Sequence, residues 1–281
     1  MSAIGQRLPR RFPFMRLAVI AVALVIVILP FWFLIVNSLK PYRETIPPGI
    51  TLPNEWVGLE NYAAVLAEGS VTRGFINTGI VLASAIPVVL ILSAAAAWVF
   101  TRVQSRSLKV LYYAMLLGVA VPPAIVASIF TLKILGIYGG FPGLASLYSA
   151  WYIPLGIFLI AGFVRTIPVE LEESARIDGA GNLTIFVRIV LPLLAPVLIT
   201  TGLIVAIALW NDFLTPFMML TGTQNNTLML SLFDFATSST VGSSYSWNLL
   251  FADVILTSIP MLVVYYFAQR YVVHGLAGVG K

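Results

Sequence analysis

The stretch EESARIDGAGNLTIFVRIVLP, residues 172–192, is unusual because it is rich in charge while the chain around it is mostly apolar. Acids follow Pro168 in the first turn of a predicted helix, where they suit the positive end of the helix dipole. A glycine pair beginning at Gly179 then breaks the helix, and a second amphipathic run leads to Pro192. The predicted helix, about 170–181, is too short to cross a bilayer. Helices on lipid usually have a basic polar face, so its exposed acids indicate a protein partner.

The composition indicates that lipid is the main solvent of this chain. Of its 281 residues, 59% are hydrophobic and 10% are charged, whereas a soluble protein has about 25% charged residues. The net charge of +5 fits basic residues that orient a membrane protein, and no basic patch with interleaved aromatics indicates nucleic acid. Without cysteine, and with His274 as its single histidine, the chain is expected to hold no metal and no cofactor.

Apolar segments long enough to cross a hydrocarbon core of about 30 Å recur along the sequence. We therefore predict an all-α integral membrane protein with six transmembrane helices, at 17–36, 75–100, 110–132, 145–163, 193–214 and 249–269. Lysine and arginine gather on one side of this topology, which predicts cytoplasmic tails at 1–16 and 270–281 and a cytoplasmic position for the charged helix. The loops 37–74 and 215–248 are then extracytoplasmic.

The C-terminal sequence GLAGVGK, residues 275–281, formally matches the core of a phosphate-binding loop. That loop requires a preceding strand, a Ser or Thr for magnesium, and a helix whose N-terminus faces the phosphate. Here a membrane helix precedes the motif and the sequence ends at Lys281. We interpret the segment as a glycine-rich tail, and expect this chain to bind no ATP.

The spacing within residues 172–192 resembles the EAA loop of ABC importer permeases, which is E-A-A, three residues, G, nine residues and I-x-L-P. Every spacing fits, and the one departure is a serine in place of the first alanine. Serine is small, so a closely packed helix tolerates it. The matching residues are Glu173, Ser174, Ala175, Gly179, Ile189, Leu191 and Pro192.

Further motifs resemble the carbohydrate branch of these importers, and in particular its MalG-type subunit. A short first loop and six helices fit that subunit better than the larger MalF-type subunit. At position 78 the family more often has serine. The motifs are FVRTIP at 163–168, IDGA at 177–180, WNDF at 210–213, NY at 61–62, NT at 77–78, QR at 269–270 and GL at 275–276.

The resemblance implies a type-1 permease fold with its core at 75–267, in a bacterial or archaeal cytoplasmic membrane. The short helix would be the coupling helix, docked into one of two ATP-binding subunits that hold ATP and magnesium. A second, MalF-like permease subunit and an extracytoplasmic solute-binding protein would complete the importer. The loop at about 222–246 would reach the binding protein. The chain itself would be a transport subunit and not an enzyme, and it would move a sugar or oligosaccharide by alternating access.

The resemblance also implies which residues couple the chain to the ATPase. Glu173 would pair with a basic or amide group of the ATPase, and Ala175 would pack where no larger side chain fits. Gly179 would end the helix with a positive φ or a close approach. Arg176 and Asp178 either steer docking or pair with each other or with solvent. The coupling residues are Glu172, Glu173, Ser174, Ala175, Asp178, Gly179, Ala180, Ile189, Leu191 and Pro192.

A candidate substrate path lies at the end of the fifth predicted span. Trp210 offers an indole to a sugar ring, and Asn211 and Asp212 offer polar groups to its hydroxyls. The alternative is structural: Trp210 lies in an interfacial belt, while Asn211 and Asp212 brace the helix end. Asp253, near the start of the last span, is interpreted as interfacial.

Other functions compete with sugar import. The same machinery could carry glycerol-phosphate, a polyol or another small solute, and the sequence does not name the cargo. An ion-coupled secondary transporter often has paired repeats and ionisable groups at mid-membrane, neither of which is evident here. A membrane enzyme would need several catalytic groups at one depth, which a chain with one histidine supports poorly.

Overall fold

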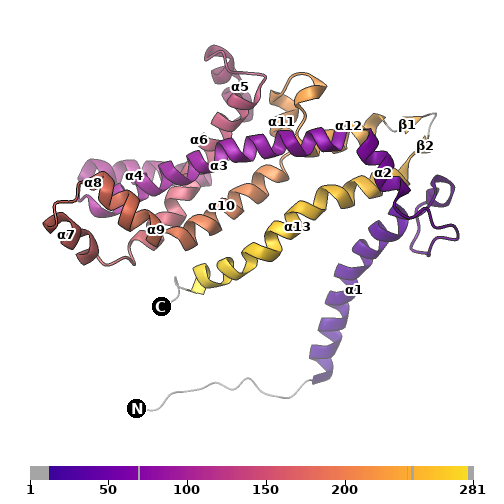
Figure 1. Cartoon of the computed structure of the whole chain (residues 1–281), viewed down its shortest axis with the longest axis horizontal. Coiled ribbons are helices and arrows are strands. Elements are labelled where there is room, and N and C mark those ends of the chain that lie inside the picture. The colour runs from indigo at the N-terminus through magenta and orange to yellow at the C-terminus, as the bar shows by residue number, and fades with distance from the viewer. Residues whose placement is uncertain (1–12, 69, 239, 242–243, 278–281) are drawn as a thin grey trace. The chain divides into compact units, whose positions relative to one another are not determined.

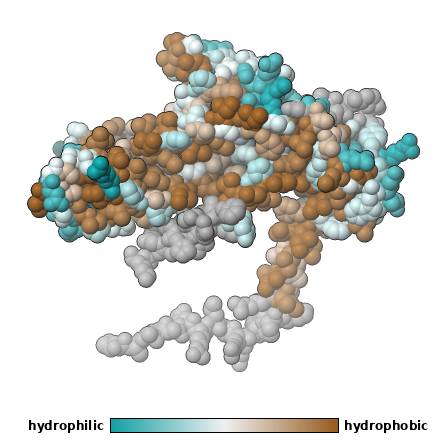
Figure 2. Space-filling model, in the orientation of Figure 1, coloured by the Kyte–Doolittle hydropathy of each residue, from teal (hydrophilic) through white to brown (hydrophobic). Residues whose placement is uncertain are grey.

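The computed structural model describes residues 13–68, 70–238, 240–241 and 244–277 (Figure 1). The expectations for residues 1–12 and 278–281, and for the side chains of Arg16, Arg270 and His274, lie outside what is described. The regular secondary structure of the described part is helical except for two short paired strands, β1 (Thr240–Val241) and β2 (Ser244–Tyr245). Apolar residues cover much of the visible surface (Figure 2), as expected where lipid is the solvent.

The chain divides into two compact units, of which the first comprises Met1–Ala67 and Ser238–Leu256. It contains α1 (Pro13–Ser38), η1 (Tyr42–Thr45), α2 (Glu60–Ala67), the two strands and the start of α13 (Trp247–Ala277). A buried amide closes the turn after α1, because Asn61 donates to the carbonyl oxygens of Ser38 and Lys40 at 2.8 and 2.9 Å. The buried Lys40 ammonium donates to the carbonyl of Gly49 at 3.1 Å.

The second unit comprises Glu68–Thr237 and Thr257–Lys281. Its helices begin with the long α3 and end with the rest of α13. In chain order they are α3 (Ser70–Arg102), α4 (Arg106–Ala120), α5 (Ile125–Ile134), α6 (Phe141–Val164), α7 (Glu170–Ile177), α8 (Asn182–Ile185), the π-helical turn η2 (Phe186–Val190), α9 (Leu191–Leu193), α10 (Ala195–Trp210), α11 (Leu214–Met219), η3 (Thr223–Asn225) and α12 (Leu228–Ser238).

Helices α3 and α6 form the centre of the second unit because small residues let their backbones approach closely. A Cβ atom at Gly156 of α6 would lie 2.3 Å from the Ser93 hydroxyl of α3. That hydroxyl donates to the Ile153 carbonyl at 3.1 Å. Ala94, Ala97 and Ala161 are fully buried alongside.

Four helices are long and apolar enough to cross a membrane in the described residues, or up to six if each of two bent pairs is one span. The first bent pair corresponds to the expected span 110–132. It is divided into α4 and α5 with a bend of 117°. Pro122 and Pro123 lie between them and cannot donate the backbone hydrogen bonds of a continuing helix. The second bent pair, with 74° between its halves, joins α8–α9 to α10.

Three predicted boundaries differ in the structure. The charged helix ends at Ile177 instead of about 181, because the backbone turns at Gly179. The predicted loop 215–248 contains the short helices α11, η3 and α12 in its described part, and apolar residues in it such as Met219, Leu228 and Phe235 are buried. Helix α13 continues past 269 to Ala277, so the first residues of the expected C-terminal tail are helical.

Candidate functional site

Helix α7 ends in a hydrogen-bonded turn that requires glycine. Gly179 has a φ of +83°, which confirms the expected positive φ. Its N–H donates to the backbone carbonyl of Arg176 at 3.0 Å, and the N–H of Ala180 donates to the carbonyl of Ala175 at 2.9 Å. This pair of bonds is a Schellman motif. It satisfies the last carbonyls of the helix and turns the chain toward α8.

Most of the surface of α7 is open to solvent or to a partner. Leu171 and Ile177 expose 46% and 86% of their surface, and Glu173 is exposed with them. Leu183, just after the turn, is 75% exposed. Apolar side chains of this size next to a carboxylate are the composition of a protein-binding surface. The geometry therefore fits a partner in contact with α7.

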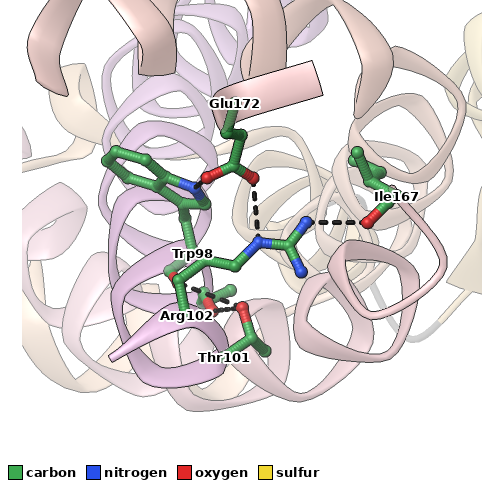
Figure 3. A network of polar contacts seen from close by, with 6 residues as sticks. Trp98, Thr101, Arg102, Ile167 and Glu172 are labelled. Atoms are coloured by element: carbon green, nitrogen blue, oxygen red, sulfur yellow. Dashed lines mark hydrogen bonds and ion pairs between the residues drawn. The ribbon is translucent and has the colours of Figure 1, made fainter. Parts of the chain in front are cut away.

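The inner side of α7 is held by Glu172, the only buried residue of this helix. This corrects the expectation that Glu172 belongs with the exposed acids. Its carboxylate accepts hydrogen bonds from Trp98 Nε1 at 3.0 Å and from Arg102 Nε at 2.8 Å (Figure 3). Arg102 also donates from Nη2 to the carbonyl of Ile167 at 2.8 Å. Because both partners lie near the end of α3, four residues apart, the carboxylate joins α7 to that helix.

Apolar packing surrounds this network. The Trp98 ring lies 5.5 Å from the ring of Phe186, centroid to centroid. Ala175 and Ala180 pack on the same buried cluster, and the need for a small residue at 175 stays a prediction. Phe186 begins the π-helical turn η2, in which the Leu191 N–H donates to the Phe186 carbonyl. Leu191 also contacts the cluster, while Ile189 is half-buried and Pro192 is exposed.

The remaining predicted residues of the loop are on the surface. An ion pair joins Arg102 to Glu172, whereas none joins Arg176 to Asp178. Both are exposed. Ser174 is exposed too, and its hydroxyl donates back to the Glu170 carbonyl at 2.8 Å.

The candidate substrate residues lie at the junction of α10 and α11. Asp212 accepts from the hydroxyl of the buried Tyr148 at 2.9 Å and from the Thr215 N–H at 3.1 Å. The Asn211 amide donates to its own helix, at the Ile207 carbonyl. The Trp210 ring lies 6.0 Å from that of Phe75. These bonds brace the end of α10, which favours the structural alternative for Asn211 and Asp212.

The other end of α3 has a second polar contact. Asn77 donates from one amide nitrogen to the carbonyls of Gln224 and Asn226, at 2.9 and 2.8 Å. The Thr78 hydroxyl accepts from the Leu228 N–H at 2.9 Å. Gly74 lies against the same segment, where a Cβ would be 3.0 Å from the Leu228 Cα. The segment 224–228 is thereby fixed to α3.

Sequence reasoning missed the roles of Trp98 and Arg102. In the sequence, Arg102 is only one of the basic residues that orient the chain. The available signal was their spacing, because residues four apart lie on one face of a helix. No group of three His, Cys, Asp or Glu that could hold a metal occurs among the residues the structure describes.

The model of the family described as "Binding-protein-dependent transport system inner membrane component" matches residues 61–278. The chain belongs to this family. The expected membership is thus confirmed, and with it a multi-pass inner membrane protein. The members of this family are the permease subunits of ABC transporters, which are not themselves enzymes.

Two relatives match nearly the whole chain. The diacetylchitobiose uptake system permease protein NgcG of Streptomyces coelicolor is 32% identical, over 93% of this chain and 86% of that protein. The multiple sugar-binding transport system permease protein MsmG of Streptococcus mutans is 29% identical, over 94% of this chain and 95% of that protein.

A solved structure has the same fold. It is a chain of a bacterial ABC transporter involved in the import of the acidic polysaccharide alginate. The TM-score is 0.83, the sequence identity is 19%, and the match covers 96% of this chain and 99% of the other. The predicted type-1 permease fold is confirmed at this level. The number of spans and the orientation of the termini stay predictions.

Proposed function

We propose that this permease subunit imports a sugar or oligosaccharide and that α7 is its coupling helix. The observation that carries the proposal is the asymmetry of α7: one buried carboxylate holds it to the core while Leu171, Glu173 and Ile177 remain exposed. Cargo of the sugar class is supported by what NgcG and MsmG are named for. This chain would hold no cofactor, and ATP and magnesium would be bound by two partner subunits.

The proposed orientation has α7 and both termini in the cytoplasm. Its support is the distribution of Lys and Arg in the sequence, which is densest on the side of α7. The segment with η3 and α12 would then face outward, toward a solute-binding protein. A second permease subunit would complete the pathway, with both subunits alternating between inward- and outward-open states.

The test of the coupling role is a pull-down of the tagged chain, co-expressed with an ATP-binding subunit, a second permease and a binding protein of the same importer. Glu173→Lys reverses a charge on the exposed face of α7. We expect the wild type to retain the ATP-binding subunit and the variant to lose it. Loss of the second permease is not expected.

A matched control is Glu55→Lys, which reverses an exposed acid in the loop after α1. It should retain every partner. If Glu173→Lys retains the ATP-binding subunit as well as Glu55→Lys does, α7 is not the docking helix. Uptake of labelled mono- and oligosaccharides, compared with labelled glycerol-phosphate and polyols, tests the cargo class.

A further inference from the structure

The position of α7 depends on very few contacts. The helix has eight residues, and only one of them is buried. Glu172 has 1% of its side chain exposed, and Arg102, its ion-pair partner, has 14%. A charge-assisted pair this sheltered is strong and strongly directional. Any displacement of α7 must therefore either break this pair or move the end of α3.

Arg102 holds three parts of the chain together. It is the last residue of α3, it pairs with α7 through Glu172, and it binds the Ile167 carbonyl in the connection after α6 (Figure 3). A cation at this position also suits the negative end of the α3 dipole. Trp98 adds a second donor one turn earlier. Arg102, Trp98 and Glu172 together form one hydrogen-bonded junction between α3 and α7.

A comparable hydrogen-bonded junction lies near the other end of α3. Asn77 and Thr78 bind backbone groups of segment 224–228 by three hydrogen bonds of 2.8–2.9 Å. Both side chains are buried, with 6% and 3% exposed. Asn77 and Arg102 are separated by roughly 38 Å of continuous helix, at about 1.5 Å per residue. Figure 1 shows α3 running between the two regions.

We propose that α3 is the element that couples α7 to segment 224–228, with Glu172, Arg102 and Trp98 as positioning residues at one end and Asn77 and Thr78 at the other. A displacement of α7 moves α3 through the Glu172–Arg102 ion pair. The movement of α3 then displaces segment 224–228 through the hydrogen bonds of the Asn77 amide. This inference rests on the proposed function, in which α7 meets the ATP-binding subunit and segment 224–228 faces the binding protein.

The experiment uses the complete complex in lipid nanodiscs with a single cysteine at Thr223→Cys. Thr223 is exposed beside the clamped segment, and the chain has no native cysteine. The rate at which a thiol-reactive dye labels this position is measured without nucleotide and after trapping with ATP and vanadate. We expect trapping to change the rate. In Arg102→Met and in Asn77→Ala, the nucleotide-dependent change should fall by about fivefold or more.

Additional variants separate a loss of coupling from other effects of the substitutions. Thr101→Ala is the matched control, because this hydroxyl bonds only to its own helix; it should keep the full change. Trp98→Phe keeps the ring contact but removes one donor, and should give a partial loss. If Arg102→Met releases the ATP-binding subunit, its labelling result no longer tests the coupling through α3. Asn77→Ala then provides the test, because Asn77 lies far from α7 and should not affect docking.

The proposal is overturned if complexes that retain the ATP-binding subunit show no nucleotide-dependent change in the wild type. It is also overturned if Asn77→Ala keeps the full wild-type change. Both results leave the proposed function intact. A wild-type chain that captures no ATP-binding subunit instead overturns the proposed function, and this inference with it.

Discussion

The α7 segment and the α10–α11 junction both carry acids that the sequence marks as functional, yet the structure uses them differently. In the α7 segment one acid, Glu172, forms a buried ion pair with Arg102 of the same chain, while its neighbour Glu173 is exposed. At the junction Asp212 already accepts bonds from Tyr148 and Thr215. A polar group available to a partner and a polar group that braces a helix look alike in sequence. Their hydrogen-bond partners tell them apart.

The largest effect is expected where the α7 segment depends on its buried pair. Glu172→Ala should lower the free energy of unfolding by about 3–5 kcal/mol, because it leaves a sheltered guanidinium without its carboxylate. Thermal unfolding of the purified chain in detergent measures the change. The adjacent Glu173→Ala should alter stability by less than about 0.5 kcal/mol. Equal losses for the two variants would remove the distinction between the two acids.

At the α10–α11 junction, Tyr148→Phe should cost about 1.5–3 kcal/mol, because it removes a hydrogen bond to a carboxylate. The same unfolding measurement applies, together with cargo uptake by the protein that remains folded. Tyr113→Phe is the control, since Tyr113 is 65% exposed. Unchanged stability with a loss of cargo affinity would mean that the junction binds substrate and does not brace the helix.

Gly179→Ala should destabilise the α7 segment by about 1–2 kcal/mol, the cost of a side chain at positive φ. No atom lies within 4 Å of the added Cβ, so the cost is conformational and not steric. Gly181→Ala has the same open surroundings but a φ of −73°, and should be nearly neutral. Similar unfolding temperatures for both variants would contradict the assigned turn.

The smallest effect is expected for Ser174→Ala, which restores the alanine of the EAA pattern. The Ser174 side chain is exposed and bonds only to its own helix, so stability should change by less than about 0.5 kcal/mol. Capture of the ATP-binding subunit should not change either. A marked loss of capture would show that this hydroxyl belongs to the docking surface.

Local features of the α7 segment could be predicted because they depend on nearby residues. The break at Gly179 follows from a glycine after an amphipathic turn, and the small residue at 175 follows from the motif. The six apolar stretches follow from composition, although the break at Pro122 and Pro123 divides one of them into two helices.

The burial of Glu172 could not be predicted, because its partners lie 70 and 74 positions away. The clamp of Asn77 on segment 224–228 joins residues almost 150 positions apart. Nor does the WNDF sequence show that Asp212 is already satisfied, since Tyr148 lies on another helix. In each case the deciding contact is made only when α3, α6 and α10 pack together.

The π-helical turn at Phe186–Val190 bears on the spacing of the EAA motif. A π turn holds one more residue than the α-helical turn it interrupts, as a single-residue insertion into a helix would leave it. The turn begins within the nine residues between Gly179 and Ile189, so helix winding contributes to the length of this spacer. A homologue with a spacer of eight should have an ordinary α-helical turn here, and its side chains after the turn should keep the orientation that they have in this chain.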